Sequence, residues 1–208
     1  GKTGGNPGAA QTLGNLAAFR QDNPRRLLGY STISQSGYLL MAVAVAGKSS
    51  LALSALLLYL AAYAAANLGA FAVVAELPHA TTLADYTGLA RRHRGLAAVL
   101  VVCLLALVGT PPTAVFFGKL SVFSAAGDGG VGWLVVIAAI NTAASLFYYL
   151  RWLAPAFRHP PTPVASLALQ PAGLASKFAT YAAGVVVLAL GLASGAGFIL
   201  FTGPLAAR

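Results

Sequence analysis

Acidic residues and cysteine are both scarce in this chain. Of its 208 residues only 4 are aspartate or glutamate, one is cysteine, and charged residues of either sign make up 8%. A soluble domain carries about a quarter charged residues, so a soluble globular protein is excluded. The lone cysteine excludes a disulfide-stapled secreted domain and a thiolate metal site. The formal charge of +9 does not indicate nucleic-acid binding, because the basic residues stand in short clusters between long apolar runs.

Apolar residues are abundant instead, at 58% of the chain, and the mean hydropathy is +0.78. A helix needs about 20 apolar residues to cross a bilayer. The runs that reach this length lie at residues 27–46, 51–75, 96–126, 131–153 and 178–201. They predict an all-α fold, a polytopic transmembrane helix bundle, with a five-span membrane domain over residues 27–208.

The first 26 residues precede these runs. Residues 9–19 are apolar but too short to span a membrane, so we interpret residues 1–26 as the end of a preceding helix followed by a cytoplasmic loop. The chain opens with Gly1 and lacks the basic-then-apolar layout of a signal peptide. We therefore expect the sequence to be the C-terminal part of a longer protein.

The basic residues divide unequally between the two sides of the predicted membrane domain. One side receives Arg20, Arg25, Arg26, Arg91, Arg92, Arg94, Arg151, Arg158 and Lys177, and the other receives Lys48 and Arg208. Short cytoplasmic loops retain an excess of lysine and arginine, which predicts a multi-pass protein of the cell inner (plasma) membrane with its Arg-rich loops in the cytoplasm. Trp133 and Trp152 bracket the fourth run and are predicted to anchor it at the two interfaces.

The run at residues 96–126 is longer than a bilayer needs and contains a Gly-Thr-Pro-Pro sequence in its middle. Proline supplies no N–H, so Pro111 and Pro112 deprive the carbonyls near Leu107 and Val108 of their helical partners. Irregular backbone at membrane depth persists only where protein or a water-filled cavity surrounds it. We predict a helix broken at Thr110, Pro111 and Pro112, with a tolerated proline kink as the alternative.

Lys119 follows this break and is the one charged residue deep inside a predicted span. A lysine in hydrocarbon either extends to the interface or faces a polar interior. A buried lysine can gain and lose a proton, which is what a proton relay requires. Lys119 is therefore the leading candidate for a proton relay, with extension to the interface as the alternative.

Polar residues recur at helical spacing in other spans and indicate faces in contact with water or with neighbouring helices. These stripes supply the candidates for a polar axis beside the lysine: Gln35, Tyr38, Tyr63, Asn67 and Asn141. Packing by hydrogen bonds between helices explains such stripes equally well. Glu76, at the end of its run, is interpreted as a solvated helix end, with proton entry as the weaker alternative.

Several segments together resemble the antiporter-like membrane subunits of the proton-pumping NADH-quinone oxidoreductase, complex I, and its N chains most closely. The segments are GNLAAFRQDNPRRLLGYSTISQSGYLL from Gly14, YAAANLGAFAVV from Tyr63, DYTGLARR from Asp85, LVGTPPTAVFFGK from Leu107 and SLFYYLR from Ser145. The resemblance implies a subunit of two inverted five-helix repeats, each with one broken helix, of which this chain holds roughly the last third. It also implies that Lys119 exchanges protons with the outer side and that Pro111 and Pro112 form the break.

One departure from the family pattern concerns Gln35, because the family usually has histidine there. Glutamine cannot titrate, so a relay step at this position has to run through water or neighbouring hydroxyls. The glutamate and lysines of the family's first half lie outside these residues, so a complete half-channel cannot be built from this chain alone.

The resemblance implies that the chain takes part in proton translocation coupled to quinone reduction, as a subunit of a translocase. No cofactor or metal is expected in it: NADH, flavin, iron-sulfur clusters and quinone belong to the whole complex. The expected partners are the other membrane subunits of complex I and the lipid bilayer, without nucleic acid. A subunit of a multisubunit cation/proton antiporter and a non-translocating membrane scaffold are the alternatives.

Overall fold

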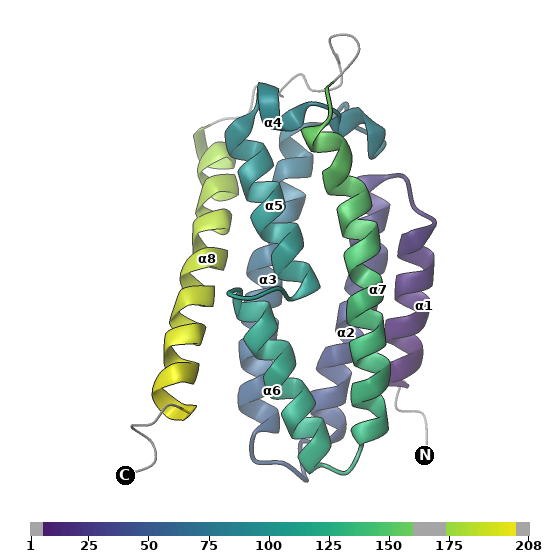
Figure 1. Cartoon of the computed structure of the whole chain (residues 1–208), viewed down its shortest axis with the longest axis vertical. Coiled ribbons are helices and arrows are strands. Elements are labelled where there is room, and N and C mark those ends of the chain that lie inside the picture. Colours follow the sequence, from purple (N-terminus) through teal and green to yellow (C-terminus); the bar gives the residue numbers. More distant parts are fainter. Residues whose placement is uncertain (1–5, 160–173, 203–208) are drawn as a thin grey trace.

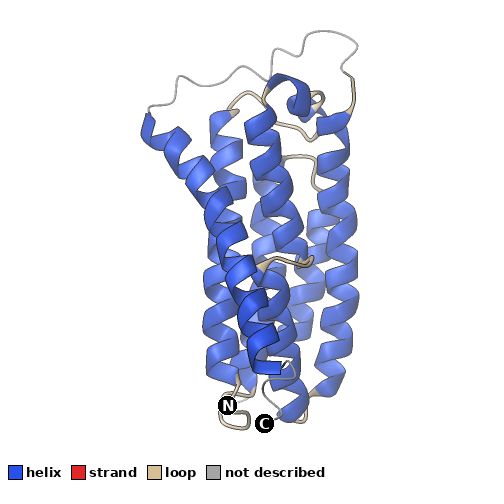
Figure 2. Ribbon diagram, turned by 60° about the vertical axis from the view of Figure 1, so that its left-hand side comes forward, coloured by secondary structure: helices blue, strands red, loops and turns tan. Residues whose placement is uncertain are grey.

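The computed structural model describes residues 6–159 and 174–202, and every regular element within them is helical. In chain order the elements are α1 (Pro7–Phe19), α2 (Pro24–Ala44), α3 (Ala52–Glu76), the 3₁₀ turn η1 (Ala84–Tyr86), α4 (Leu89–Arg92), α5 (Arg94–Val108), α6 (Ala114–Asp128), α7 (Gly132–Phe157) and α8 (Leu174–Thr202). The long helices stand side by side as an up-and-down bundle (Figures 1 and 2). The predicted all-α transmembrane bundle is confirmed.

The long helices of the bundle differ in how apolar they are, and so in how well their composition suits a membrane span. By length and composition, α3, α7 and the Lys177–Gly195 part of α8 can each cross a membrane. The 21-residue helix α2 carries several serines, a threonine and a glutamine on its turns, which lowers its hydropathy. Helices α5 and α6 have 15 residues each and stand end to end in Figure 1, so that the pair makes one crossing with an interruption halfway.

One end of the bundle, here called the arginine end, carries the turn between α1 and α2, the η1–α4 segment and the end of α7 (Figure 1). The arginines at positions 20, 25, 26, 91, 92, 94, 151 and 158 lie in or beside these segments. The turn between α2 and α3, with Lys48, lies at the opposite end. The basic residues are thus separated as the sequence predicts, while the cytoplasmic side of the arginine end stays a prediction. Lys2 and Arg208 fall outside the described residues.

The prediction that Trp152 anchors the bundle at a membrane interface is wrong. Its side chain is fully buried, and its ring packs edge-to-face against Tyr86 with the centroids 5.4 Å apart. The η1–α4 segment folds over the end of α7, where the Gly88 N–H donates to the Pro155 carbonyl over 3.2 Å. This segment covers Trp152, whereas Trp133 at the other end of the helix is 58% exposed.

Candidate functional site

The interruption between α5 and α6 has two causes in the backbone. Gly109 has a left-handed φ of 90°, which ends α5. The N–H groups of Gly109 and Thr110 both donate to the Leu105 carbonyl, each over 3.2 Å. Proline has no N–H, so Pro111 and Pro112 cannot supply the helical hydrogen bonds that the carbonyls of Leu107 and Val108 would accept from positions four residues later. The break therefore leaves two carbonyl oxygens in the interior that need donors from elsewhere.

Lys119 supplies one of these donors. Its Nζ donates to the Val108 carbonyl over 2.9 Å and lies 3.4 Å from the Leu107 carbonyl oxygen. The ammonium also lies over the ring of Tyr38, 4.6 Å from the centroid, where a cation is attracted to the aromatic face. Only 3% of the side chain is exposed, so Lys119 faces the interior of the bundle and does not extend to the interface.

Gln35 supplies the second donor, since its Nε2 donates to the Leu107 carbonyl over 2.9 Å. The hydroxyl of Tyr59 on α3 donates in turn to the Gln35 Oε1. The Tyr38 hydroxyl reaches α7, where it donates to the Ala138 carbonyl over 3.0 Å. We call this group of four side chains around the break the lysine cluster: Lys119, Gln35, Tyr38 and Tyr59.

Tyr63 extends the polar groups from the lysine cluster toward the arginine end. Its ring stacks on that of Tyr59 with the centroids 6.3 Å apart, and its hydroxyl donates to the Thr32 Oγ1 over 2.8 Å. Thr32 lies one turn before Gln35 on α2, on the side of the arginine end. Helices α2 and α3 thus present hydroxyl groups in sequence from the break toward that end.

Helix α8 covers the break along the side of α5 and α6, as Figure 2 shows. Gly191 of α8 lies directly against the Pro112 carbonyl, and a Cβ on it would stand only 3.0 Å from the Thr113 Cα. A residue with a side chain at this position would hold α8 away from the irregular backbone. The close contact puts protein around the interruption, as irregular backbone at membrane depth requires.

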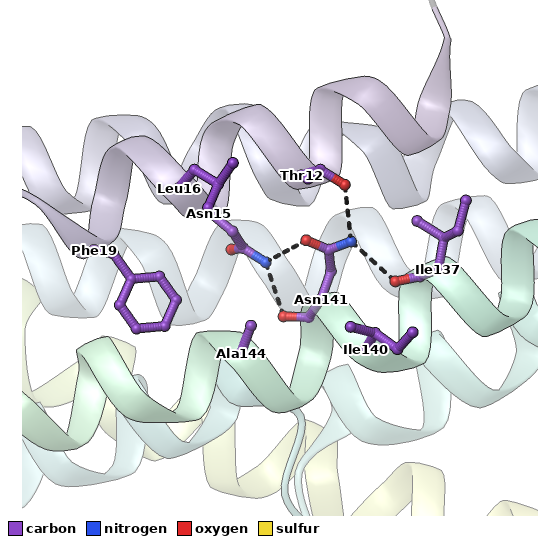
Figure 3. Close-up of a pocket in the computed structure, with 8 residues that line it drawn as sticks. All are labelled: Thr12, Asn15, Leu16, Phe19, Ile137, Ile140, Asn141 and Ala144. Carbon is purple, nitrogen blue, oxygen red and sulfur yellow. Dashed lines mark hydrogen bonds between the residues drawn. The ribbon is translucent and has the colours of Figure 1, made fainter.

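Asn141 lies in a second polar group, which faces α1 (Figure 3). The Asn15 Nδ2 donates to both the side-chain and main-chain oxygens of Asn141 over 2.8 Å, and the Asn141 Nδ2 donates to the Thr12 Oγ1 over 3.2 Å. The Tyr148 hydroxyl donates to the Asn15 Oδ1 over 3.0 Å. Above these groups α1 and α7 form an open groove of about 350 Å³ whose walls are mainly apolar. We call Thr12, Asn15, Asn141 and Tyr148 the asparagine cluster.

The remaining candidates lie elsewhere on α3. Asn67 is partly buried, and its Oδ1 has no hydrogen-bond partner among the residues that the structure describes. Glu76 is only 2% exposed at the arginine end of α3, so its interpretation as a solvated helix end is wrong. The local sequence does not reveal this burial, although Leu77 and Ala80 just after the helix are buried too.

Four residues of these clusters were missed as site candidates: Tyr59, Tyr148, Thr12 and Asn15. Tyr59 shares a helical stripe with Tyr63 and Asn67, so its spacing already indicated a place on the polar face. Asn15 lies in the short apolar helix α1, where a single asparagine gives no periodic signal. Asn15 belongs to the cluster because α7 lies beside α1, and the sequence alone does not show that these two helices are neighbours.

The chain has relatives among known protein families and curated proteins. It matches the family described as NADH:quinone oxidoreductase/Mrp antiporter, TM, over residues 8–145. It is 58% identical to the NADH-quinone oxidoreductase subunit N 1 of Streptomyces griseus over 187 residues, which cover 90% of this chain and 39% of that protein. It is 59% identical to the subunit N of Mycobacterium sp. (strain JLS) over 151 residues, which cover 73% of this chain and 32% of that protein. The chain thus spans about a third to two fifths of these relatives.

Solved structures agree with this assignment. The fold superposes on a chain of respiratory complex I from Thermus thermophilus with bound Aureothin with a TM-score of 0.78 and 33% identity, covering 93% of this chain and 43% of that one. A chain of the Mrp complex from Dietzia sp. shares the fold at a TM-score of 0.77 with 23% identity, covering 95% of this chain and 46% of that one. With its broken helix and the match over most of its length, the chain belongs to the NADH:quinone oxidoreductase/Mrp antiporter transmembrane family.

Proposed function

We propose that this chain forms part of a proton-translocating membrane-arm subunit of NADH-quinone oxidoreductase, in which Lys119 takes up and releases the proton. The observation that carries the proposal is the position of its Nζ, which is buried on the Val108 carbonyl at the end of a broken helix. An amine is the one titratable group in the lysine cluster that can exchange a proton near neutral pH without forming a tyrosinate. High identity to the subunits N of Streptomyces griseus and Mycobacterium sp. (strain JLS) supports the assignment to this enzyme.

The surroundings of Lys119 suit the amine both with and without its extra proton. A neutral amine still has two N–H groups for the carbonyls of Leu107 and Val108. A protonated amine meets the negative end of the α5 dipole and the face of the Tyr38 ring. The N–H groups of the amine therefore have partners in both charge states, which is a property that a relay group needs.

The hydroxyls of Tyr59, Tyr63 and Thr32 supply a route between the lysine cluster and the arginine end, opposite to the outer side with which the resemblance has Lys119 exchange protons. They follow one another from the break toward the arginine end, and each hydroxyl can both donate and accept. We assign this end to the cytoplasm because basic loops are retained there. NADH, flavin, iron-sulfur clusters and quinone are assigned to other parts of the complex, whose neighbouring membrane subunits and lipids are the partners of this chain.

The function is tested in cells that produce the whole subunit containing this chain. We expect inverted membrane vesicles from these cells to acidify when NADH is added, and vesicles from a strain lacking the subunit to lose this signal. Expression of the subunit from a plasmid should restore it. Unchanged NADH-driven acidification in the deletion strain would contradict the proposal.

A cation/proton antiporter is the second candidate function, and the specific observation that favours it is the shared fold with the Mrp complex. The two candidates differ in their energy source. Proton movement that depends on a sodium gradient and ignores NADH would favour the antiporter, whereas movement that depends on NADH and persists without sodium favours the oxidoreductase.

Tyr59→Phe tests whether the hydroxyl of Tyr59 positions Gln35. The substitution leaves the Gln35 Oε1 buried without its donor, which costs about 1–3 kcal/mol. We expect the subunit to assemble and NADH-driven pumping to fall severalfold, because the released amide no longer holds the Leu107 carbonyl. Tyr181→Phe on α8, whose side chain is 46% exposed, is the matched control and should pump normally. Equal pumping rates in both variants would show that Tyr59 has no positioning role.

A further inference from the structure

A second recess, distinct from both polar clusters, lies on the outer face of α2 beside the arginine end. It has a volume of about 320 Å³ and is lined by Gln21, Arg26, Gly29, Tyr30 and Ile33. The four residues of α2 follow helical spacing and form one stripe over the first turns of the helix. We call this recess the headgroup groove.

We propose that the headgroup groove binds an anionic phospholipid, with the phosphate at Arg26 and Gln21 and an acyl chain running over Gly29 to Ile33. A guanidinium presents a planar fork of donors that matches a phosphate. The Gln21 amide donates one N–H to the Ala17 carbonyl over 3.3 Å and has a second N–H for the ligand. We take the occupant to be a membrane lipid because an exposed arginine and exposed apolar side chains lie together on one face of α2 that the other described helices leave uncovered.

The charge around the groove favours an anion. Arg20, Arg25 and Arg26 lie within seven residues, at the connection between α1 and α2. All three are exposed, and Asp22 is the one acidic residue among them. Within the described residues no carboxylate forms an ion pair with Arg26, so its guanidinium is available to a ligand. Arginine beside the membrane surface contributes about a fivefold preference for an anionic lipid.

The shape and polarity of the groove fit a lipid lying along the helix. Gly29 forms an open floor, since a Cβ added there would meet no atom within 4 Å. Tyr30 and Ile33 are 37% and 48% exposed and continue the groove with apolar surface. Ile33 lies about 10 Å along the axis from Arg26, so the lining changes from charged to apolar in the order of a phosphate and its acyl chain.

The test places a photoreactive benzoylphenylalanine at Ile33 in the whole subunit. The assembled complex is reconstituted in vesicles of equal parts phosphatidylglycerol and phosphatidylethanolamine, irradiated, and the captured lipid is identified by mass spectrometry. Phe147 of α7 carries the same probe as a control, because it is 66% exposed and stands about as far from the arginine end. We expect phosphatidylglycerol to exceed phosphatidylethanolamine about fivefold at Ile33 and to show no preference at Phe147.

Two further variants separate a site from the general attraction of a basic protein for anionic lipids. Arg26→Gln should remove the preference at Ile33, whereas Arg91→Gln, at an exposed arginine on α4 of the same end, should leave it unchanged. Equal lipid ratios at the two probes, a preference that survives Arg26→Gln, or capture of a protein at Ile33 would each overturn the proposal. None of these outcomes depends on whether the chain translocates protons.

Discussion

Proton pumping is expected to fall by about tenfold or more when Lys119 is replaced by methionine or by arginine in the assembled enzyme. Methionine keeps much of the side-chain volume but cannot carry a proton, so the Val108 carbonyl loses its donor and the relay its exchanging group. Arginine keeps the charge but holds its proton permanently, so uptake and release stop even where the charge is preserved. NADH-driven acidification of inverted vesicles measures the loss.

The arginine variant distinguishes proton exchange from a purely structural charge. Full pumping by Lys119→Arg would show that only the charge matters, and would contradict the relay. Lys48→Met, at an exposed lysine in the turn between α2 and α3, is the control and should pump normally. The amount of subunit in the assembled complex, read on native gels, ensures that a lower rate does not arise from lost assembly.

The broken helix is the feature that the sequence predicts best, because its cause is local. A proline removes one helical hydrogen bond at a known position, so Pro111 and Pro112 identify the two carbonyls that need other donors. The structure supplies these donors from Lys119 and Gln35, which are far apart in sequence from each other. Helical periodicity placed Gln35 and Tyr38 on one face of α2, and that face turns out to meet the break.

Features that depend on which helices become neighbours could not be predicted in the same way. Asn141 lies on a polar stripe of α7, but the stripe itself does not say whether it faces α6 or α1, and the partner Asn15 sits in a helix without a polar pattern. Glu76 and Trp152 were expected at a solvated or interfacial surface because they stand near helix ends. Both are buried, and Trp152 is covered by the η1–α4 segment through the ring of Tyr86.

The position of α1 rests on a close contact with α2, made by one glycine from each helix. A Cβ at Gly14 would stand 2.9 Å from the Tyr30 carbonyl oxygen of α2. A Cβ at Gly37 would stand 2.7 Å from the Pro7 carbonyl oxygen and 3.0 Å from the Gln11 nitrogen of α1. These neighbours are backbone atoms, which cannot move aside as the end of a flexible side chain can. The two helices approach this closely only because both positions lack a side chain.

Gly37→Ala is therefore expected to destabilise the assembled subunit by about 1–3 kcal/mol, because α1 must shift away from α2. The shift also draws Asn15 away from Asn141, so the contact between α1 and α7 weakens with it. Gly127→Ala in α6 is the matched control: nothing lies within 4 Å of its added methyl group, and alanine in a helix gains about 0.5–1 kcal/mol over glycine. Thermal dissociation of the purified complex should thus shift down for Gly37→Ala and stay equal or shift up for Gly127→Ala. The same shift in both variants would mean that the contact between α1 and α2 tolerates a side chain, and that α1 is held by its bonds to α7 instead.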